Sequence, residues 1–409
     1  MTRLLRPLFL AAAIVLAAIA PPAFAQTPKP APLTILVSVD GFRADYLQRG
    51  KTPALSAMAA DGAFAAMRPS FPSITFPNHY TLVTGLRPDE HGVIDNNMED
   101  AARPGVVFLL SKPDIVHDPI WWDQAEPLWV TAENQGVRTA TMFWPGSDAP
   151  IHGVQPHDWR LFDKTVPSAA RTEQVLSWLD RPPAERPRFV TLYFNAVDSA
   201  GHLAGPDSDD VDKALTETDA AVVLLLKGLA ARHLLETTNV IVVADHGMAA
   251  TSHERVTYLS DLMPATAFHA VSQGAESGIR PMPGHEEEVA QALLVRHDHM
   301  TCWRKADIPA RFHFGKNPRV PPLYCLADVG WMVEAAHTAY PTPKGEHGYD
   351  PNDPQMAALF IAHGPSFNHG VTLPSFDNVD VYPLLAALTG VKPRPNDGRL
   401  ADLAPALAK

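Results

Sequence analysis

Short apolar, β-branched runs that alternate with helical stretches constrain the fold of this chain more than any other feature. Thr52-Pro53, after the first run, predicts a helix opened by a cap residue with proline at its first position. Acidic residues followed by a one-sided apolar pattern predict a long helix over 207–232. The expected strands are 33–39, 137–144, 189–194, 240–244 and 357–362. This alternation predicts an α/β fold with a mainly parallel central sheet and helices on both faces, whose ligands bind beyond the carboxyl ends of the strands.

The alternation is lost between residues 249 and 342, where prolines cluster. We interpret 249–342 as an inserted cap subdomain, and 33–248 together with 343–409 as the core. Cys302 and Cys325, the only two cysteines, both lie in the insertion. An even pair in an oxidising compartment favours one disulfide, and two buried free thiols are the alternative.

The N-terminus has the pattern of a signal peptide. Arg3 and Arg6 precede an apolar run over 8–20, and Ala23-Phe24-Ala25 has the small-x-small form of a cleavage site. A membrane anchor is the alternative, but the run is short for a bilayer span and Pro21-Pro22 interrupts it. We therefore expect a signal peptide over 1–25, a Pro-rich leader over 26–32, and a periplasmic or secreted protein without a stable membrane span.

The net charge of −12, without a basic block, argues against a duplex nucleic-acid partner, because such a partner needs a Lys/Arg face. A phosphate-handling site on this chain would need local positive charge, and metal ions are the obvious source. The charge does not indicate an oligomeric state.

Carboxylates and imidazoles recur where the predicted strands end. Any one of them is more often a turn residue or a satisfied histidine than a ligand, but their joint occurrence favours a metal site. Mixed carboxylate and imidazole ligands suit zinc, and two zinc ions need about six protein ligands. Asp245 and His246 are adjacent, and neighbouring residues of a strand point to opposite faces. They can share a metal only if the chain has left the strand 240–244 there, and Gly247 makes such a turn feasible. The six candidate ligands are Asp40, Asp198, His202, Asp245, His246 and His347.

Thr75, in a Pro-punctuated segment, is the candidate nucleophile. A threonine hydroxyl is a poor nucleophile until a base or metal activates it. Alone, the segment would be a loop whose threonine caps a helix. Asn96 offers an amide donor for a phosphoryl oxygen, although an Asn-Asn pair by itself is a turn signal.

Together these segments resemble the nucleotide pyrophosphatase/phosphodiesterase (NPP) family of the alkaline phosphatase superfamily. The shared stretches occur in the family's order from about residue 33 to 365. They are VSVDGFR, FPSITFPNHYTLVTGLRPDEHGVIDNNM, PLWVTAENQG, FWPGSD, NAVDSAGH, VVADHGM and GEHGYD.

The resemblance implies an alkaline phosphatase-like core and two zinc ions. By motif, one zinc would be held by Asp198, His202 and His347, and the other by Asp40, Thr75, Asp245 and His246. The implied enzyme is a phosphodiesterase or nucleotide pyrophosphatase, which acts on a small-molecule phosphodiester or nucleotide and releases a nucleoside monophosphate from nucleotides. Thr75 would form a phospho-threonine intermediate, and Asn96 would hold a non-bridging oxygen. Phe76 and Trp159 fall where nucleotide-using relatives hold a base between aromatic rings; the alternative for both is ordinary packing.

Four other functions are alternatives to a phosphodiesterase. A phosphomonoesterase of the superfamily typically has serine at position 75 and a magnesium site whose ligands are not found. A sulfatase needs a C/S-x-P-x-R motif that neither cysteine provides. Phosphonoacetate hydrolase also uses threonine. A non-catalytic exported binding protein would not need the complete set of ligands and Thr75. The natural substrate stays open among nucleotides, dinucleotides, nucleotide sugars and lipid head groups.

Overall fold

A computed structural model describes residues 31–109, 112–339 and 341–408. Its central sheet has eight strands in the order β18-β2-β17-β8-β1-β7-β5-β6. β1 lies between β7 and β8 and is parallel to both, whereas β17 is antiparallel to its two neighbours. The strands are β1 (Leu33–Val39), β2 (Ala63–Met67), β5 (Thr139–Met142), β6 (Asp158–Trp159), β7 (Phe189–Phe194), β8 (Thr238–Val243), β17 (Ala358–His363) and β18 (Val371–Thr372). The predicted α/β fold with a mainly parallel sheet is confirmed.

The five predicted strands correspond to β1, β5, β7, β8 and β17. The range 137–144 was too long at its carboxyl end, because Phe143 has a φ of 61° and leaves the extended conformation. Three strands of the central sheet were missed. β2 is alanine-rich, and β6 and β18 have two residues each, so none carries a recognisable β-branched run.

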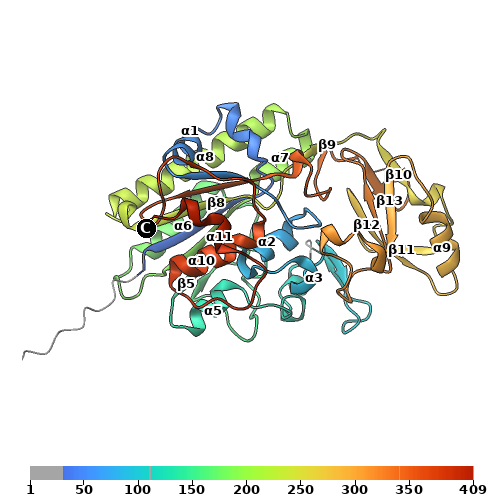
Figure 1. Ribbon diagram of the computed structural model, residues 1–409, viewed down its shortest axis with the longest axis horizontal. Coiled ribbons are helices and arrows are strands. Elements are labelled where there is room, and N and C mark those ends of the chain that lie inside the picture. The colour runs from blue at the N-terminus through green and yellow to red at the C-terminus, as the bar shows by residue number, and fades with distance from the viewer. Residues whose placement is uncertain (1–30, 110–111, 340, 409) are drawn as a thin grey trace, which may run out of the picture. The chain divides into compact units, whose positions relative to one another are not determined.

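Helices cover both faces of the sheet (Figure 1). α1, α6 and α7 pack around α8 on one face, and α2, α5 and α10 pack together on the other. The bounds are α1 (Pro53–Asp61), α2 (Thr75–Thr84), α3 (Pro88–His91), α4 (Pro113–Val116), α5 (Leu128–Asn134), α6 (Ser168–Leu179), α7 (Ala196–Ala204), α8 (Asp209–Ala231), α10 (Val381–Thr389) and α11 (Leu400–Leu403). No helix within the described ranges combines the length and apolarity needed to cross a membrane. The predicted signal peptide and most of the leader lie outside these ranges.

The start of α1 lies where it is predicted, with Pro53 as its first residue. Thr52 stands at the cap position, but its side chain makes no capping hydrogen bond. Instead the Asp219 carboxylate, on α8, accepts from the backbone N–H groups of Ala54 at 3.1 Å and Leu55 at 2.9 Å. A residue distant in sequence therefore satisfies the free amide groups of this helix.

The segment 249–342 forms a second group of strands apart from the central sheet (Figure 1). Four of them make an antiparallel sheet in the order β11-β12-β14-β13, with α9 beside it. Arg319 joins the segment to the core, since its guanidinium donates to Asp100 at 2.6 Å and to three backbone carbonyls. The elements are β10 (Val256–Tyr258), β11 (Phe268–Ala270), β12 (Glu276–Pro281), α9 (Glu286–Leu293), β13 (Met300–Arg304), β14 (Leu323–Ala327) and β15 (Met332–Glu334). We retain 249–342 as the proposed extent of the cap.

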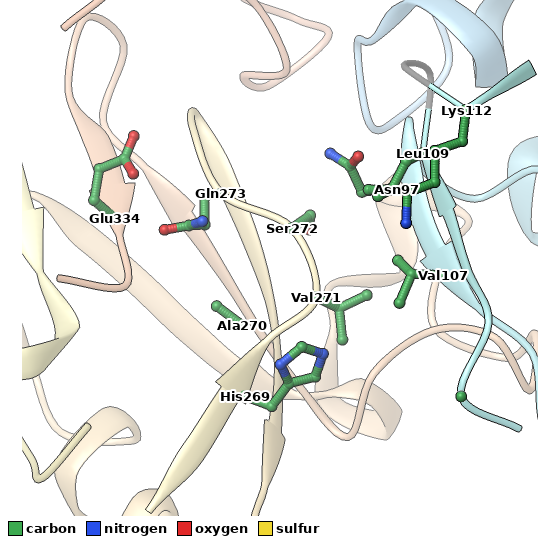
Figure 2. Close-up of a pocket in the computed structure, with 11 residues that line it drawn as sticks. Asn97, Val107, Leu109, Lys112, His269, Ala270, Val271, Ser272, Gln273 and Glu334 are labelled. Atoms are coloured by element: carbon green, nitrogen blue, oxygen red, sulfur yellow. The ribbon is translucent and has the colours of Figure 1, made fainter. Parts of the chain in front are cut away.

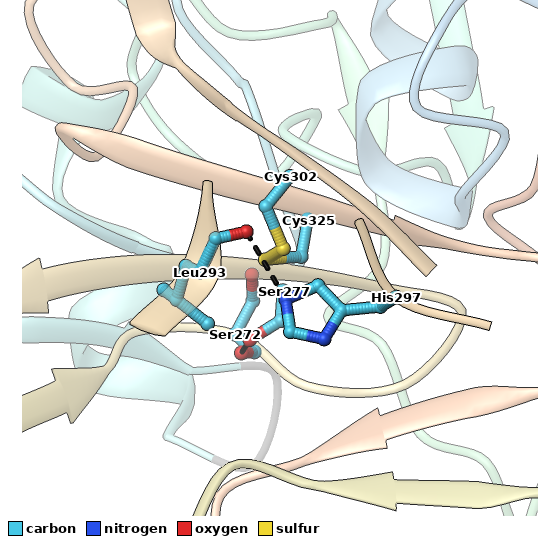
Figure 3. Close-up of a disulfide and its surroundings, with 6 residues drawn as sticks. All are labelled: Ser272, Ser277, Leu293, His297, Cys302 and Cys325. Carbon is cyan, nitrogen blue, oxygen red and sulfur yellow. Dashed lines mark hydrogen bonds between the residues drawn. A yellow bond between two sulfur atoms is a disulfide. The ribbon is translucent and has the colours of Figure 1, made fainter. Parts of the chain in front are cut away.

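Cys302 on β13 and Cys325 on β14 face each other across the two strands and form a disulfide, beside Ser277 (Figure 3). The predicted bridge is confirmed, and the alternative of two free thiols is wrong.

Candidate active site

Polar side chains from three neighbouring strands meet at the carboxyl end of the sheet. Asp40 follows β1, Asp198 lies on α7 just after β7, and Asp245 follows β8. Because β1 is parallel to β7 and β8, these three chain ends lie next to one another. Gly41, with a φ of +68°, allows the close approach: a Cβ there would lie 3.0 Å from the Cα and Cβ of Asp198.

The first group of candidate ligands is Asp198, His202 and His347. Asp198 and His202 lie one turn apart on α7, and Asp198 Oδ1 is 3.3 Å from His202 Nε2. His347 follows β16 (Gly345–Glu346), which pairs with β9 (Ala249–Ala250). Its Nε2 lies 3.1 Å from His202 Nε2 and 3.5 Å from Asp198 Oδ1.

The second group is Asp40, Asp245 and His246, with Thr75 beside it. His246 Nε2 lies 3.1 Å from Asp245 Oδ2, 3.4 Å from Asp40 Oδ1 and 3.2 Å from Thr75 Oγ1. Both ligands after β8 can face this point because the strand ends at Val243. Gly247 has a different role from the predicted one, since a Cβ there would lie 2.0 Å from the carbonyl oxygen of Gln355. The imidazoles of His246 and His347 stack with centroids 3.6 Å apart, which joins the two groups.

The donor atoms fit a pair of metal ions. Each histidine directs Nδ1 to a backbone carbonyl: His202 to Gly345 at 2.9 Å, His246 to Gly247 at 2.8 Å, and His347 to Ser73 at 3.1 Å. A carbonyl only accepts, so Nδ1 carries the proton and the Nε2 lone pair is free for a metal.

The carboxylates support the same interpretation. Asp40 Oδ1, Asp198 Oδ1 and Asp245 Oδ2 are buried without a hydrogen-bond partner. Burial, together with the Asp245 and Asp198 carboxylates, raises the pKa of Asp40 well above its ordinary value. Buried carboxylates without donors are costly unless a cation offsets them. These donor types and numbers suit zinc.

Three further residues, which the sequence did not single out, support or extend this cluster. Tyr193 donates its hydroxyl to Asp40 Oδ2. His79 donates from Nδ1 to the backbone carbonyl of Thr75 at 2.9 Å, so its Nε2 accepts from Ser38 Oγ at 2.8 Å; Nδ1 also lies 3.2 Å from Asp245 Oδ2. Glu346 has Oε1 3.8 Å from His202 Nδ1 and 3.9 Å from His347 Nε2. The sequence offers no local signal for Tyr193, whereas His79 and Glu346 lie inside quoted motifs.

Thr75 is the first residue of α2, and 7% of its surface is exposed. The free amide groups and the dipole at a helix N-terminus favour an anion. Asn96 Oδ1 accepts from the backbone N–H of Phe76 at 2.9 Å, so the side-chain donor that remains is Nδ2. The predicted nucleophile, the predicted amide donor and a helix N-terminus thus come together.

A cavity of about 310 Å³ opens beside Thr75, Asp40 and Asp198. Phe76 lines it, as do Leu161 and Phe162 from the loop after β6. Trp159 does not line it; this residue lies in β6, paired with Thr141 of β5. The predicted partner of Phe76 is therefore not at this cavity, and besides Phe76 the aromatic residues that line it include Phe162, Trp144 and Tyr193.

Comparisons with known proteins agree with this geometry. The family described as type I phosphodiesterase / nucleotide pyrophosphatase matches residues 34–350. Ectonucleotide pyrophosphatase/phosphodiesterase family member 3 of Rattus norvegicus is 40% identical over 379 residues, which cover 90% of this chain but only 43% of the rat protein. An uncharacterized pyrophosphatase/phosphodiesterase of Schizosaccharomyces pombe is 38% identical over 381 residues, or 89% of this chain and 78% of the yeast protein.

The solved structure of murine ectonucleotide pyrophosphatase/phosphodiesterase 5 is similar, with a TM-score of 0.88 at 31% identity, and covers 92% of this chain and 100% of that one. A threonine-to-alanine variant of the murine protein, described as inactive and in complex with AMP, has the same TM-score of 0.88 at 30% identity.

Proposed function

This chain belongs to the type I phosphodiesterase/nucleotide pyrophosphatase family, and on that premise we propose that it is a zinc-dependent phosphodiesterase. It cleaves phosphodiester or phosphoanhydride bonds through a phospho-threonine intermediate. The observation that carries the proposal is the position of Thr75 Oγ1, 3.2 Å from His246 Nε2 at the edge of a six-residue donor cluster.

In this proposal Asp198, His202 and His347 hold one zinc, and the other is held by Asp40, Thr75, Asp245 and His246. Bound zinc would supply positive charge for the oxygens that attack and leave the phosphorus. The free Nε2 lone pairs and the unpartnered carboxylate oxygens are the donors available for it.

The chain's own residues position the phosphoryl group, and the reaction proceeds in two steps. Thr75 Oγ1 forms a bond to phosphorus while the bond from phosphorus to the leaving oxygen breaks. Water then cleaves the phospho-threonine and restores the hydroxyl. The Nδ2 of Asn96 and the first amide groups of α2 donate to the non-bridging oxygens, where charge accumulates.

The cavity indicates a nucleotide as the substrate class, because Phe76 and Phe162 provide stacking faces beside Thr75. The AMP complex of the murine relative supports the same class. The disulfide fits an oxidising compartment, so we also propose export to the periplasm or the outside after cleavage near Ala25.

Replacing Phe162 with alanine should raise the KM for a nucleotide diester such as the nitrophenyl ester of thymidine monophosphate. A stacked base contributes about 1–3 kcal/mol, so the expected rise is roughly 5- to 150-fold with a smaller change in kcat. Trp159→Ala is the matched control and should leave KM within about twofold, since this ring does not line the cavity. A large effect of Trp159→Ala together with none of Phe162→Ala would contradict the assignment.

A substrate panel tests the function itself. Purified protein is offered bis-nitrophenyl phosphate, nitrophenyl phosphate, a nitrophenyl sulfate and phosphonoacetate, each with and without chelator. We expect the highest kcat/KM for the diester and its loss on chelation. Preference for the monoester or for phosphonoacetate would identify a different hydrolase of the superfamily, and inactivity towards all four with metal and ligand still bound would indicate a binding protein.

A further inference from the structure

The ring of Phe162, which lines the cavity beside Thr75, lies on a segment without helix or strand. This segment connects the end of β6 at Trp159 to the start of α6 at Ser168. Phe162 has 47% of its surface exposed and its neighbour Leu161 has 53%. Side chains so exposed on an irregular segment are mobile unless other contacts fix the backbone. A ring that is already fixed binds a base at a smaller entropic cost than a mobile one.

Arg171 of α6 makes the contacts that fix this segment. Its side chain is buried, with 2% exposed, and its guanidinium donates three hydrogen bonds. Nε donates to the carbonyl of Val166, near the end of the segment, at 2.9 Å. Nη1 donates to the carbonyl of Tyr193 at 2.9 Å, and Nη2 to Asn195 Oδ1 at 2.8 Å. The planar guanidinium therefore joins the segment to the carboxyl end of β7, where Tyr193 and Asn195 line the same cavity.

Ring contacts extend this connection to Phe162 itself. Arg171 Cζ lies 5.0 Å from the ring centroid of Phe143 and 6.0 Å from that of Phe162. The Phe162 ring meets Phe143 at 5.2 Å and Tyr193 at 5.9 Å between centroids, both edge-on. Such cation–π and edge-to-face contacts are favourable and depend on orientation. Arg171 thus supports the Phe162 ring directly, and also through the rings and the backbone beside it.

The charge of Arg171 is unusual for a buried arginine. Its three acceptors are uncharged oxygens, and within residues 31–109, 112–339 and 341–408 no carboxylate forms an ion pair with it. A buried cation without a counter-charge is costly. Costly arrangements of this kind are expected where function requires a fixed geometry. The geometry here is that of one wall of the cavity.

We propose that Arg171 is a positioning residue for substrate selection, which holds Phe162 at the cavity so that its ring can stack on a nucleobase. The inference rests on the proposed function, and in particular on stacking by Phe162. Arg171 does not itself line the cavity. It therefore changes the preference among diesters without contacting the phosphoryl group.

Arg160 offers a matched control, because it joins the other end of the same segment to the same helix. Its Nε donates to Gln174 Oε1 at 3.2 Å, and its Cζ lies 5.5 Å from the ring centroid of Trp178. Gln174 and Trp178 both belong to α6. In the described part of the chain, Arg160 makes no hydrogen bond or ring contact with Phe162 or Tyr193.

A second groove is the competing place for a nucleoside. It has about 570 Å³ and lies between the hairpin of β3 (Asn97–Glu99) and β4 (Val107–Leu109) and the insertion, with Val107 on one side and His269 and Gln273 on the other (Figure 2). The described residues that border it include no Phe, Tyr or Trp and none of the candidate metal ligands. His269→Ala should therefore leave KM for a nucleotide diester within about twofold of the parent.

The test compares two substrates that share a leaving group. The nitrophenyl ester of thymidine monophosphate has a base to stack, and methyl nitrophenyl phosphate has none. Arg171→Met should raise KM for the nucleotide ester about tenfold and leave kcat/KM for the methyl ester within about threefold. Arg171→Lys keeps the charge but cannot make all three diverging hydrogen bonds, so its KM should lie between the two. Arg160→Met should stay within about twofold of the parent on both substrates.

A double variant shows whether the effect passes through Phe162. In a Phe162→Ala background, Arg171→Met should raise the nucleotide KM no further, because the ring that Arg171 positions is gone. The unfolding midpoint and zinc content are measured for every variant. If Arg171→Met does not fold, Arg171→Lys is compared with Arg160→Lys.

Three results would overturn the inference: parental KM in the Arg171 variants, equal losses on the two substrates, or additive effects in the double variant. A parent protein inactive on both esters would instead defeat the proposed function. The inference is then decided by calorimetric titration with AMP and with inorganic phosphate. Weaker AMP binding with unchanged phosphate binding in Arg171→Lys, and neither change in Arg160→Lys, supports it. Equal changes for both ligands, or a parent that binds AMP no more tightly than phosphate, rule it out.

Discussion

Thr75→Ala is expected to lower kcat on a nitrophenyl diester by at least about a thousandfold, because it removes the oxygen that attacks phosphorus. Alanine suits the first position of α2, so the variant should fold like the parent. Metal content by elemental analysis and the thermal unfolding midpoint should change little, since the six other donors remain. The loss is thus assigned to chemistry and not to assembly of the site.

Thr75→Ser is the matched control for this prediction. It keeps the hydroxyl at the same position next to His246 and should retain a measurable part of the parent kcat. A rapid quench of the parent with a labelled diester should trap phosphate on Thr75. If Thr75→Ala keeps parental, chelator-sensitive activity, the hydrolysis proceeds by direct attack of water and the covalent mechanism is wrong.

Metal removal is expected to abolish activity and to lower the unfolding midpoint by about 5 °C or more. Ions that bind only the folded state at about 1,000 times their dissociation constant stabilise it by about 4 kcal/mol. Without them, the unpartnered oxygens of Asp40, Asp198 and Asp245 stay buried next to one another. Scanning calorimetry before and after chelation, and again after zinc is added back, measures the effect without relying on catalysis.

A pair of histidine variants tests which side chains hold the metal. His246→Ala should lose bound zinc, because His246 Nε2 lies within 3.4 Å of both Asp40 and Asp245. His363→Ala, at the end of β17, removes a histidine that pairs with Asp61 and should leave zinc content unchanged. Equal metal content in the two variants, or a parent that takes up no zinc, would contradict the proposed centre.

Much of the site could be predicted because its signals are local. Asp40 and Asp245 each follow an apolar run, and Asp198 and His202 have the spacing of one helical turn. Thr75 belongs to a motif whose neighbours are close in sequence. The structure brings these side chains and His347 to one point, and their roles as ligands and nucleophile stay proposals.

Other features could not be predicted, because they depend on partners distant in the chain. Trp159 is predicted as the partner of Phe76 only by the family resemblance, and a two-residue strand such as β6 leaves no periodicity that could show where its side chain lies. The local pattern predicts Thr52 as the capping residue of α1, whereas the free amide groups there donate to Asp219, on a helix more than 150 residues away.

The order of apolar runs along the chain was by itself enough to determine an α/β fold with a mainly parallel sheet and polar residues at the strand ends. Strand and helix periodicities are properties of neighbouring residues. Only the tertiary structure decided which donors stay unpaired, which aromatic rings line the cavity, and which distant carboxylate caps α1. Burial and hydrogen-bond satisfaction arise between segments that are far apart in sequence, and local patterns carry no information about them.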